Sequence, residues 1–175
     1  MNILLTTYWG LPHTGGVALY ISQLKLGLER LGHNVDVLCR FPDGSGYKIL
    51  NQEREIPRSV ITPLVVPHME TYFRHRLPGI DPLIQEAEIE RYCFEVGAAY
   101  LGVDSYDLIH AQDVISARAI SRIKHPRTTL VTTIHGYLAK EWFYGLEAQG
   151  QLNDMNRRRM LWYYASHREQ LGIMS

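Results

Sequence analysis

Residues 2–39 read NILLTTYWGLPHTGGVALYISQLKLGLERLGHNVDVLC, and this stretch decides the fold. Apolar runs predict a buried strand over 2–9 and a second strand over 34–39. Between them apolar residues recur at helical spacing, and Gly32 lies just past the predicted helix end. The apolar helix positions are Val17, Tyr20, Ile21, Leu24, Leu28 and Leu31. This order predicts two parallel strands joined by a right-handed helical crossover.

The carboxyl-terminal half continues the alternation of strand and helix. Strands are predicted over 106–113 and 128–136, with a short helix over 114–124 between them, and 137–175 is mostly helical in pattern. Alternating strands and helices indicate a Rossmann-like three-layer α/β/α sandwich with a mostly parallel sheet. The length is that of one domain, so 1–175 is interpreted as a single unit.

The middle of the chain is less regular. Residues 41–48 predict a turn-rich loop, and 47–67 predict two short strands or extended segments. Three prolines place this second segment toward an edge of the sheet, because proline is confined to sheet edges. These prolines are Pro57, Pro63 and Pro67. Residues 68–82 predict a loop with at most one helical turn. A helix then begins at Pro82, with Asp81 as its cap.

Composition excludes several classes of protein. Eighteen basic residues balance eighteen acidic ones, so nothing indicates a nucleic-acid partner. There is no apolar run long enough to span a membrane, and the first ten residues lack the basic start of a signal peptide, so we expect a cytoplasmic location. Cys39 and Cys93 form no CxxC pair, and buried free thiols are favoured over a disulfide.

Polar and glycine residues follow three of the predicted strands. In open α/β sheets ligands bind beyond the carboxyl ends of the strands, and parallel strands bring those ends to one edge. The residues expected at this edge are Gly15, Gly16, His110, Gln112, Asp113, Thr133, His135 and Gly136. Their convergence is the main reason for predicting a ligand site.

The glycine pair has two interpretations. Gly15 and Gly16 lack a Cβ, so their backbone can approach a ligand closely or adopt a positive φ, and the helix beginning near Val17 directs free N–H groups there. An anion such as a diphosphate would then bind; a tight turn without ligand is the alternative. A dinucleotide site is disfavoured, because GLPHTGG is not GxGxxG and Cys39-Arg40 replaces the acidic residue that binds ribose.

Three segments, in this order, carry a resemblance: HTGGVALYISQLKLGLERLGHNVDVLC (13–39), YDLIHAQDVISARAI (106–120) and LVTTIHG (130–136). Together they resemble the amino-terminal domain of GT-B glycosyltransferases of the retaining family 4 type. The resemblance spans about residues 1–136. It implies transfer of a hexosyl group from a nucleotide-sugar donor to a hydroxyl acceptor, with a sugar, a lipid-linked molecule or another small molecule as the alternatives for that acceptor.

The resemblance also implies residue roles. Gly15 and Gly16 would approach the donor diphosphate and sugar, and His110, Asp113 and His135 would line the acceptor side or the reacting centre. The further substrate-binding candidates are His13, Thr14, Gln112, Thr133 and Gly136. Gln112 stands where family members often have a second histidine. The family needs no metal and no cofactor beyond the donor, in agreement with the lack of a DxD pair here.

The fold that the sequence resembles has two such domains with the active site between them. The carboxyl-terminal domain would hold most of the nucleotide and an E-x7-E motif. We therefore expect 1–175 to be the acceptor-side domain without its nucleotide-sugar domain, and to be inactive alone.

Plainer interpretations of the same residues remain open. His110 and His135 can be hydrogen-bonded core residues. These two histidines and His13 could also bind zinc, but they lack the short sequence spacing that zinc ligands usually show. Asp113 can be the N-cap of the following helix. Residues 157–164, RRRMLWYY, can be a solvated helix face or a peripheral membrane contact.

Two other function classes also remain open at this point. One is a non-catalytic α/β module that binds a ligand or a protein. The other is half of a sugar epimerase with the same GT-B architecture, which fold alone does not distinguish from a transferase.

Overall fold

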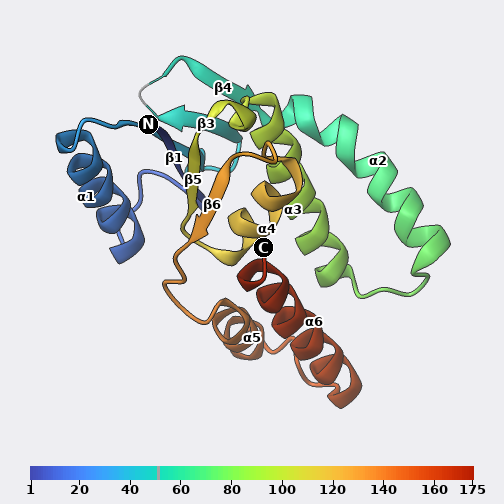
Figure 1. The fold of residues 1–175 in the computed structure, drawn as a ribbon. Coiled ribbons are helices and arrows are strands. Elements are labelled where there is room, and N and C mark those ends of the chain that lie inside the picture. The colour runs from blue at the N-terminus through green and yellow to red at the C-terminus, as the bar shows by residue number, and fades with distance from the viewer. Residues whose placement is uncertain (51) are drawn as a thin grey trace.

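A six-stranded sheet with strand order β4-β3-β2-β1-β5-β6 forms the centre of the molecule (Figure 1). The computed structural model describes residues 1–50 and 52–175. The strands are β1 (Asn2–Gly10), β2 (Asn34–Arg40), β3 (Gly46–Leu50), β4 (Arg54–Pro57), β5 (Leu108–Ala111) and β6 (Thr129–Thr132). The pairs β1–β2, β1–β5 and β5–β6 are parallel, whereas β3 and β4 form an antiparallel hairpin at one edge.

Helices cover both faces of this sheet. They are α1 (Gly16–Arg30), α2 (Arg58–Arg76), α3 (Pro82–Tyr100), α4 (Val114–Ile123), α5 (Leu138–Ala148) and α6 (Met155–Ile173), with a 3₁₀ turn at Val103–Ser105. Helix α1 lies on one side of the sheet and α3 and α4 on the other, with α2 packed against α3 (Figure 1). Helices α5 and α6 lie beyond the carboxyl end of β6, and α6 packs on α4. The predicted α/β sandwich with a mostly parallel sheet is confirmed.

Successive residues of β1 enter opposite cores. Leu4 packs with Leu38, Ile109 and Phe94 on the α3 and α4 side. Its neighbour Leu5 packs on the α1 side, in a cluster whose other buried members are Ile3, Leu11, Ile21, Val35, Val37 and Cys39. A central strand buried on both faces explains why residues 2–9 show a continuous apolar run rather than alternation.

Several local predictions are confirmed. Gly32 follows α1 with a φ of 83°, the left-handed conformation that glycine adopts readily. The Asp81 carboxylate caps α3 by accepting a hydrogen bond from the Leu83 N–H at 2.9 Å. Cys39 and Cys93 are buried free thiols that lie in the cores on opposite faces of the sheet.

Two predictions were wrong here, the extended segment up to 67 and the loop over 68–82, because Arg58–Arg76 is the 19-residue helix α2. Ile61, Val65, Met69 and Phe73 recur every four residues and form the stripe that packs toward α3 and the core. The two internal prolines, 63 and 67, lie on the exposed side, where the carbonyls that they leave unbonded can bind water. Burial of the stripe therefore outweighs the local cost of the prolines.

Smaller corrections concern strand ends. Strands β3 and β4 are the two short strands expected within 47–67, although residue 51 lies outside the described residues. The turn-rich loop expected over 41–48 already gives way to β3 at Gly46. The strand predicted over 128–136 ends at Thr132, so its polar end belongs to the following loop.

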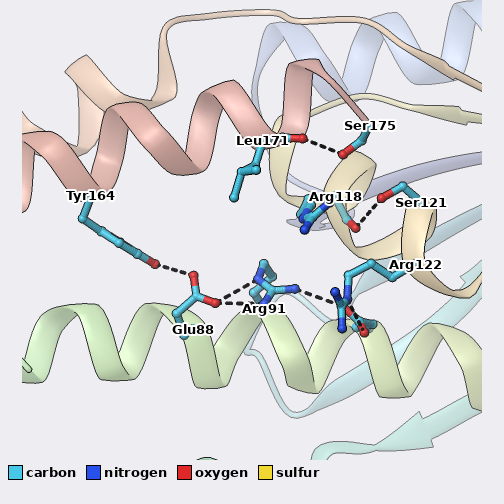
Figure 2. A network of polar contacts seen from close by, with 9 residues as sticks. Glu88, Arg91, Arg118, Ser121, Arg122, Tyr164, Leu171 and Ser175 are labelled. Atoms are coloured by element: carbon cyan, nitrogen blue, oxygen red, sulfur yellow. Dashed lines mark hydrogen bonds and ion pairs between the residues drawn. The ribbon is translucent and has the colours of Figure 1, made fainter. Parts of the chain in front are cut away.

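Polar contacts attach α6 to α3 and α3 to α4. The Tyr164 hydroxyl on α6 donates to Glu88 on α3 at 2.8 Å, and the Arg91 guanidinium donates to the same carboxylate at 2.8 Å (Figure 2). Arg91 also pairs with Glu95 at 3.0 Å, and Arg122 on α4 donates to Glu95 at 3.0 Å. The chain of contacts determines the position of α6 at the carboxyl edge of the sheet.

Of the helices described over 1–50 and 52–175, none has the length and apolar character needed to cross a bilayer.

The contact between α6 and α4 depends on Gly172. A Cβ at this position would collide with the backbone carbonyl and side chain of Val114. We expect Gly172→Ala to lower the free energy of unfolding by about 1–3 kcal/mol, the usual cost of overpacking. Gly27→Ala is the control: its Cβ would meet no atom within 4 Å, so the mid-helix change should stabilise the fold by about 0.5–1 kcal/mol. Urea denaturation of both variants tests this, and equal stabilities would contradict it.

Candidate functional site

The carboxyl ends of three parallel strands meet at one edge of the sheet. The Gln112 N–H donates to the Thr6 carbonyl at 2.8 Å, and the Thr133 N–H donates to the Ala111 carbonyl at 2.9 Å. The first bond holds the residue that follows β5 beside β1, and the second holds the residue that follows β6 beside the end of β5. The convergence that the sequence predicts at this edge is therefore present.

The first turns of α1 reach the same edge. Val17, in the first turn of α1, lines a cavity of about 150 Å³ together with Gln112 and His135. The Tyr20 ring, one turn further along α1, makes an edge contact with the His135 ring at 4.8 Å between centroids. We call this cavity the rim cavity; its other lining residues are Trp9, Asp113, Val114, Ile134, Gly136, Leu138 and Glu141.

Gln112 determines how His135 is presented. Its amide nitrogen donates to the His110 carbonyl at 3.2 Å, which directs its amide oxygen toward His135 Nε2 at 3.0 Å. An amide oxygen only accepts hydrogen bonds, so Nε2 of His135 must carry the proton. The exposed imidazole is thus held as a tautomer whose Nδ1 can accept a hydrogen bond.

His110 lies within β5, half-buried behind the rim cavity. Its Nε2 is 2.7 Å from the Thr133 hydroxyl oxygen. Burial lowers the pKa of His110 below its ordinary value of 6.5, and the nearby charge of His135 lowers that pKa further. A neutral imidazole paired with Thr133 is the form that this environment favours.

Asp113 is a buried capping residue. Its Oδ1 accepts from the N–H groups of Ile115 and Ser116 at 3.0 and 2.8 Å, at the start of α4. Its Oδ2 accepts from the Thr7 hydroxyl at 3.0 Å and the Tyr8 N–H at 2.8 Å. Burial raises the pKa of Asp113, and these hydrogen bonds oppose the increase. The N-cap interpretation is confirmed, and a role as base stays a prediction.

The backbone at Gly15 and Gly16 does not require glycine. Gly15 is the N-cap of α1 with an extended φ of 170°, and Gly16 is not among the residues with positive φ, so the conformational freedom expected of the pair is unused. A Cβ at Gly16 would meet nothing within 4 Å, and one at Gly15 would meet only the His13 ring. Open space therefore lies in front of the start of α1.

The same helix start lacks any side-chain acceptor. No acidic residue lies in the first turn of α1, and Gly15 offers no capping side chain. Its free N–H groups and positive dipole end suit an anion. His13 and Thr14 are exposed beside the glycines and line, with them, a broad hollow of about 990 Å³ along α1.

Two residues at the site were not predicted from the sequence. Glu141, in the first turn of α5, contacts Gly136 so closely that a Cβ there would collide with its carboxylate. Trp9, at the end of β1, lines the rim cavity with its side chain 42% exposed. The acidic residue following His135-Gly136 at a helix start was the available signal for Glu141.

The structure does not group the candidate histidines into a metal site. Within 1–50 and 52–175, no three His, Cys, Asp or Glu side chains lie close enough together to hold a metal ion.

Two comparisons with known proteins give glycosyltransferases, and one of them gives the family. Residues 14–169 match the sequence profile of Glycosyltransferase Family 4. A protein of Methanocaldococcus jannaschii, named as an uncharacterized glycosyltransferase, is 30% identical over 137 residues, covering 77% of this chain. The chain spans 31% of the length of that relative. No solved structure matches the chain significantly.

Replacing the buried Asp113 carboxylate with an amide should destabilise the fold. In either orientation, Asp113→Asn would turn an N–H toward a backbone N–H, so we expect the free energy of unfolding to fall by about 2–3 kcal/mol. Asp154→Asn is the control, because this exposed cap accepts only from the Arg157 N–H, at 2.7 Å, and should cost under about 1 kcal/mol. Unchanged denaturation of Asp113→Asn would contradict the capping role.

The lowered pKa of His110 predicts a pH dependence. As pH falls below 6.5 the unfolded chain takes up a proton before the folded chain does, so His110 makes stability decline until its lowered pKa is passed. In an NMR titration we expect the His110 midpoint below 6.5, moving upward in His135→Asn, which removes the neighbouring positive charge. His125→Gln, an exposed site elsewhere, should leave the midpoint unchanged. A midpoint at or above 6.5 would contradict the analysis.

Proposed function

The chain belongs to Glycosyltransferase Family 4, and on that premise we propose that it forms the acceptor-side half of a GT-B enzyme. The whole enzyme would move a hexosyl group from a nucleotide-sugar donor to a hydroxyl of the acceptor, with retention of configuration. The proposed reaction uses no metal and no further cofactor. On this point the proposal follows the family resemblance of the three sequence segments.

One observation carries the proposal: an uncapped helix start and an oriented histidine share one rim. The space in front of Gly16 would admit the donor diphosphate, whose negative charge grows as the bond to the sugar breaks. The N–H groups at the start of α1 would neutralise part of that charge. His135, which lines the rim cavity together with Val17 of the first turn of α1, would lie beside the reacting centre.

The other rim residues would bind the substrates. His135 Nδ1 and the Glu141 carboxylate can each accept a hydrogen bond from an acceptor hydroxyl, which would orient it for attack. Gln112 would act by holding His135, and the pair of His110 and Thr133 by supporting the floor behind it. Gly136 admits the Glu141 carboxylate.

The proposal includes a second domain that binds the nucleotide and closes over this rim. His13, Thr14, Gly15 and Gly16 are all exposed to solvent and would face it. Since such a domain would supply most of the donor contacts, the isolated chain 1–175 should bind donor weakly and transfer nothing.

A cytoplasmic location, with peripheral contact to the membrane, completes the proposal. Within RRRMLWYY, Arg157 is paired with Asp81 at 2.6 Å and Arg158 with Glu147 at 2.6 Å. Arg159, Trp162 and Tyr163 are exposed. Among the described residues Arg159 has no ion-pair partner, so contact with anionic lipid would rest mainly on this arginine and two aromatic rings, which makes it weak.

The test uses the full-length protein that contains this domain, assayed with a panel of nucleotide sugars and hydroxyl acceptors. Gly16→Val should leave stability unchanged, because the position faces open space, yet should lower kcat/KM at least about 100-fold by blocking the diphosphate. Gly27→Val is the control. A Cβ at this position also meets free space, but Gly27 lies near the other end of α1, so this variant should retain activity.

The assay products distinguish the remaining alternatives. Release of a nucleoside diphosphate with a glycosylated acceptor supports transfer, whereas an isomerised nucleotide sugar would indicate an epimerase. Full activity in Gly16→Val would contradict the proposed donor position.

A further inference from the structure

A second cavity, of about 290 Å³, lies beside the rim cavity. Trp9 and Leu138 line both cavities, so the two adjoin. Its remaining walls come from β1, α3, α4, α5 and α6, and its polar and aromatic lining consists of Tyr8, Trp9, Glu86, Glu90, Trp142 and Arg168. We call it the Arg168 cavity.

Arg168 is a buried cation without an anionic partner. Its side chain is only 9% exposed, yet across the described part of the chain no carboxylate lies within ion-pair distance of it. Its guanidinium carbon instead lies 5.5 Å from the ring centroids of both Trp142 and Tyr164. Its guanidinium nitrogens are not wholly enclosed, so the charge faces the cavity, and the aromatic faces offset only part of the cost of removing it from bulk water.

The carboxylates of the cavity do not balance this charge. Glu90 forms an ion pair with Arg58 and a second with Arg40 at 3.4 Å. Glu86 is exposed to solvent. The Glu90 charge is therefore met by two arginines that do not line the cavity, and the Glu86 charge is screened by solvent.

The position of Arg168 is imposed by its neighbours rather than accidental. Tyr164, one turn earlier on α6, is held by its hydrogen bond to Glu88, which Arg91 in turn binds (Figure 2). The fixed Tyr164 ring and Trp142 on α5 together support the guanidinium where it lines the cavity.

We propose that the Arg168 cavity binds an anionic group, a carboxylate or a phosphate, carried by a sugar acceptor. Arg168 would pair with the two oxygens of that group, and the Trp9 and Trp142 rings would pack against the sugar. The acceptor hydroxyl would then extend past Trp9 into the rim cavity. This assignment of an acidic acceptor rests on the proposed function.

Binding to the chain can be measured without any transfer activity. The sequence holds three tryptophans, of which Trp9 and Trp142 line the cavity and Trp162 does not. Titrations with glucuronate, glucose 6-phosphate and neutral glucose are followed through the indole N–H signals in NMR spectra. We expect a charged sugar to shift the Trp9 and Trp142 signals at concentrations at least about tenfold lower than glucose, with Trp162 as internal reference. Whichever of the two charged sugars binds more tightly identifies the anion.

Variants separate binding from a structural role. Arg168→Gln should abolish the preference for charged sugars without lowering the melting temperature, because it removes an unpaired buried charge. Arg168→Lys should keep part of the preference. Arg159→Gln, an exposed arginine on the same helix, should change neither property.

Several results would overturn the proposal. These are equal binding of glucose and both charged sugars, shifts confined to Trp162, a preference that survives in Arg168→Gln, or a melting temperature of Arg168→Gln more than about 5 °C below wild type. Loss of the proposed function alone would look different, since transfer would be absent while the charge-dependent binding persisted. If the full-length enzyme transferred sugar to neutral acceptors and Arg168→Gln left that transfer unchanged, the proposal of an acidic acceptor would be wrong. The proposed transferase function would stand.

Discussion

The carboxylate of Asp113 is the constraint on which the site depends. It accepts two hydrogen bonds from the last part of β1 and two from the first turn of α4. A single buried group thereby ties the end of the central strand to the start of the helix that follows the next strand. Burying a carboxylate is expensive unless its oxygens are satisfied, so the four donors and the carboxylate must be kept together.

The geometry of the rim follows from this tie. Gln112 directly precedes Asp113, and its amide is orientated by the His110 carbonyl so that it sets the tautomer of His135. Trp9 directly follows Tyr8, whose N–H is bound by Asp113, and so projects between the two cavities. The residues next to these hydrogen bonds in the chain are therefore Gln112, which contacts the exposed histidine, and Trp9, which lines both cavities.

Patterns local in sequence predicted much of this fold. The β1-α1-β2 unit follows from apolar spacing and Gly32, and parallel strands then bring the start of α1 and His135 to one edge. Helix α2 was not predicted because its prolines disfavour a helix in any local reading of the sequence. The stabilisation gained by burying Ile61, Val65 and Phe73 depends on α3, which is distant in sequence. Glu141 and Arg168 were missed because their sites exist only once α5 and α6 pack across the strand ends.

Residues that the fold does not need are the ones that point to ligands. The contact of α6 with Val114 requires glycine at position 172, and this contact is a sufficient reason for the residue. Gly16 has neither a positive φ nor a close neighbour, and among the described residues no carboxylate pairs with the buried Arg168. One position leaves room for negative charge and the other supplies positive charge, on opposite sides of Trp9. Two anionic groups, one on each substrate, would account for both.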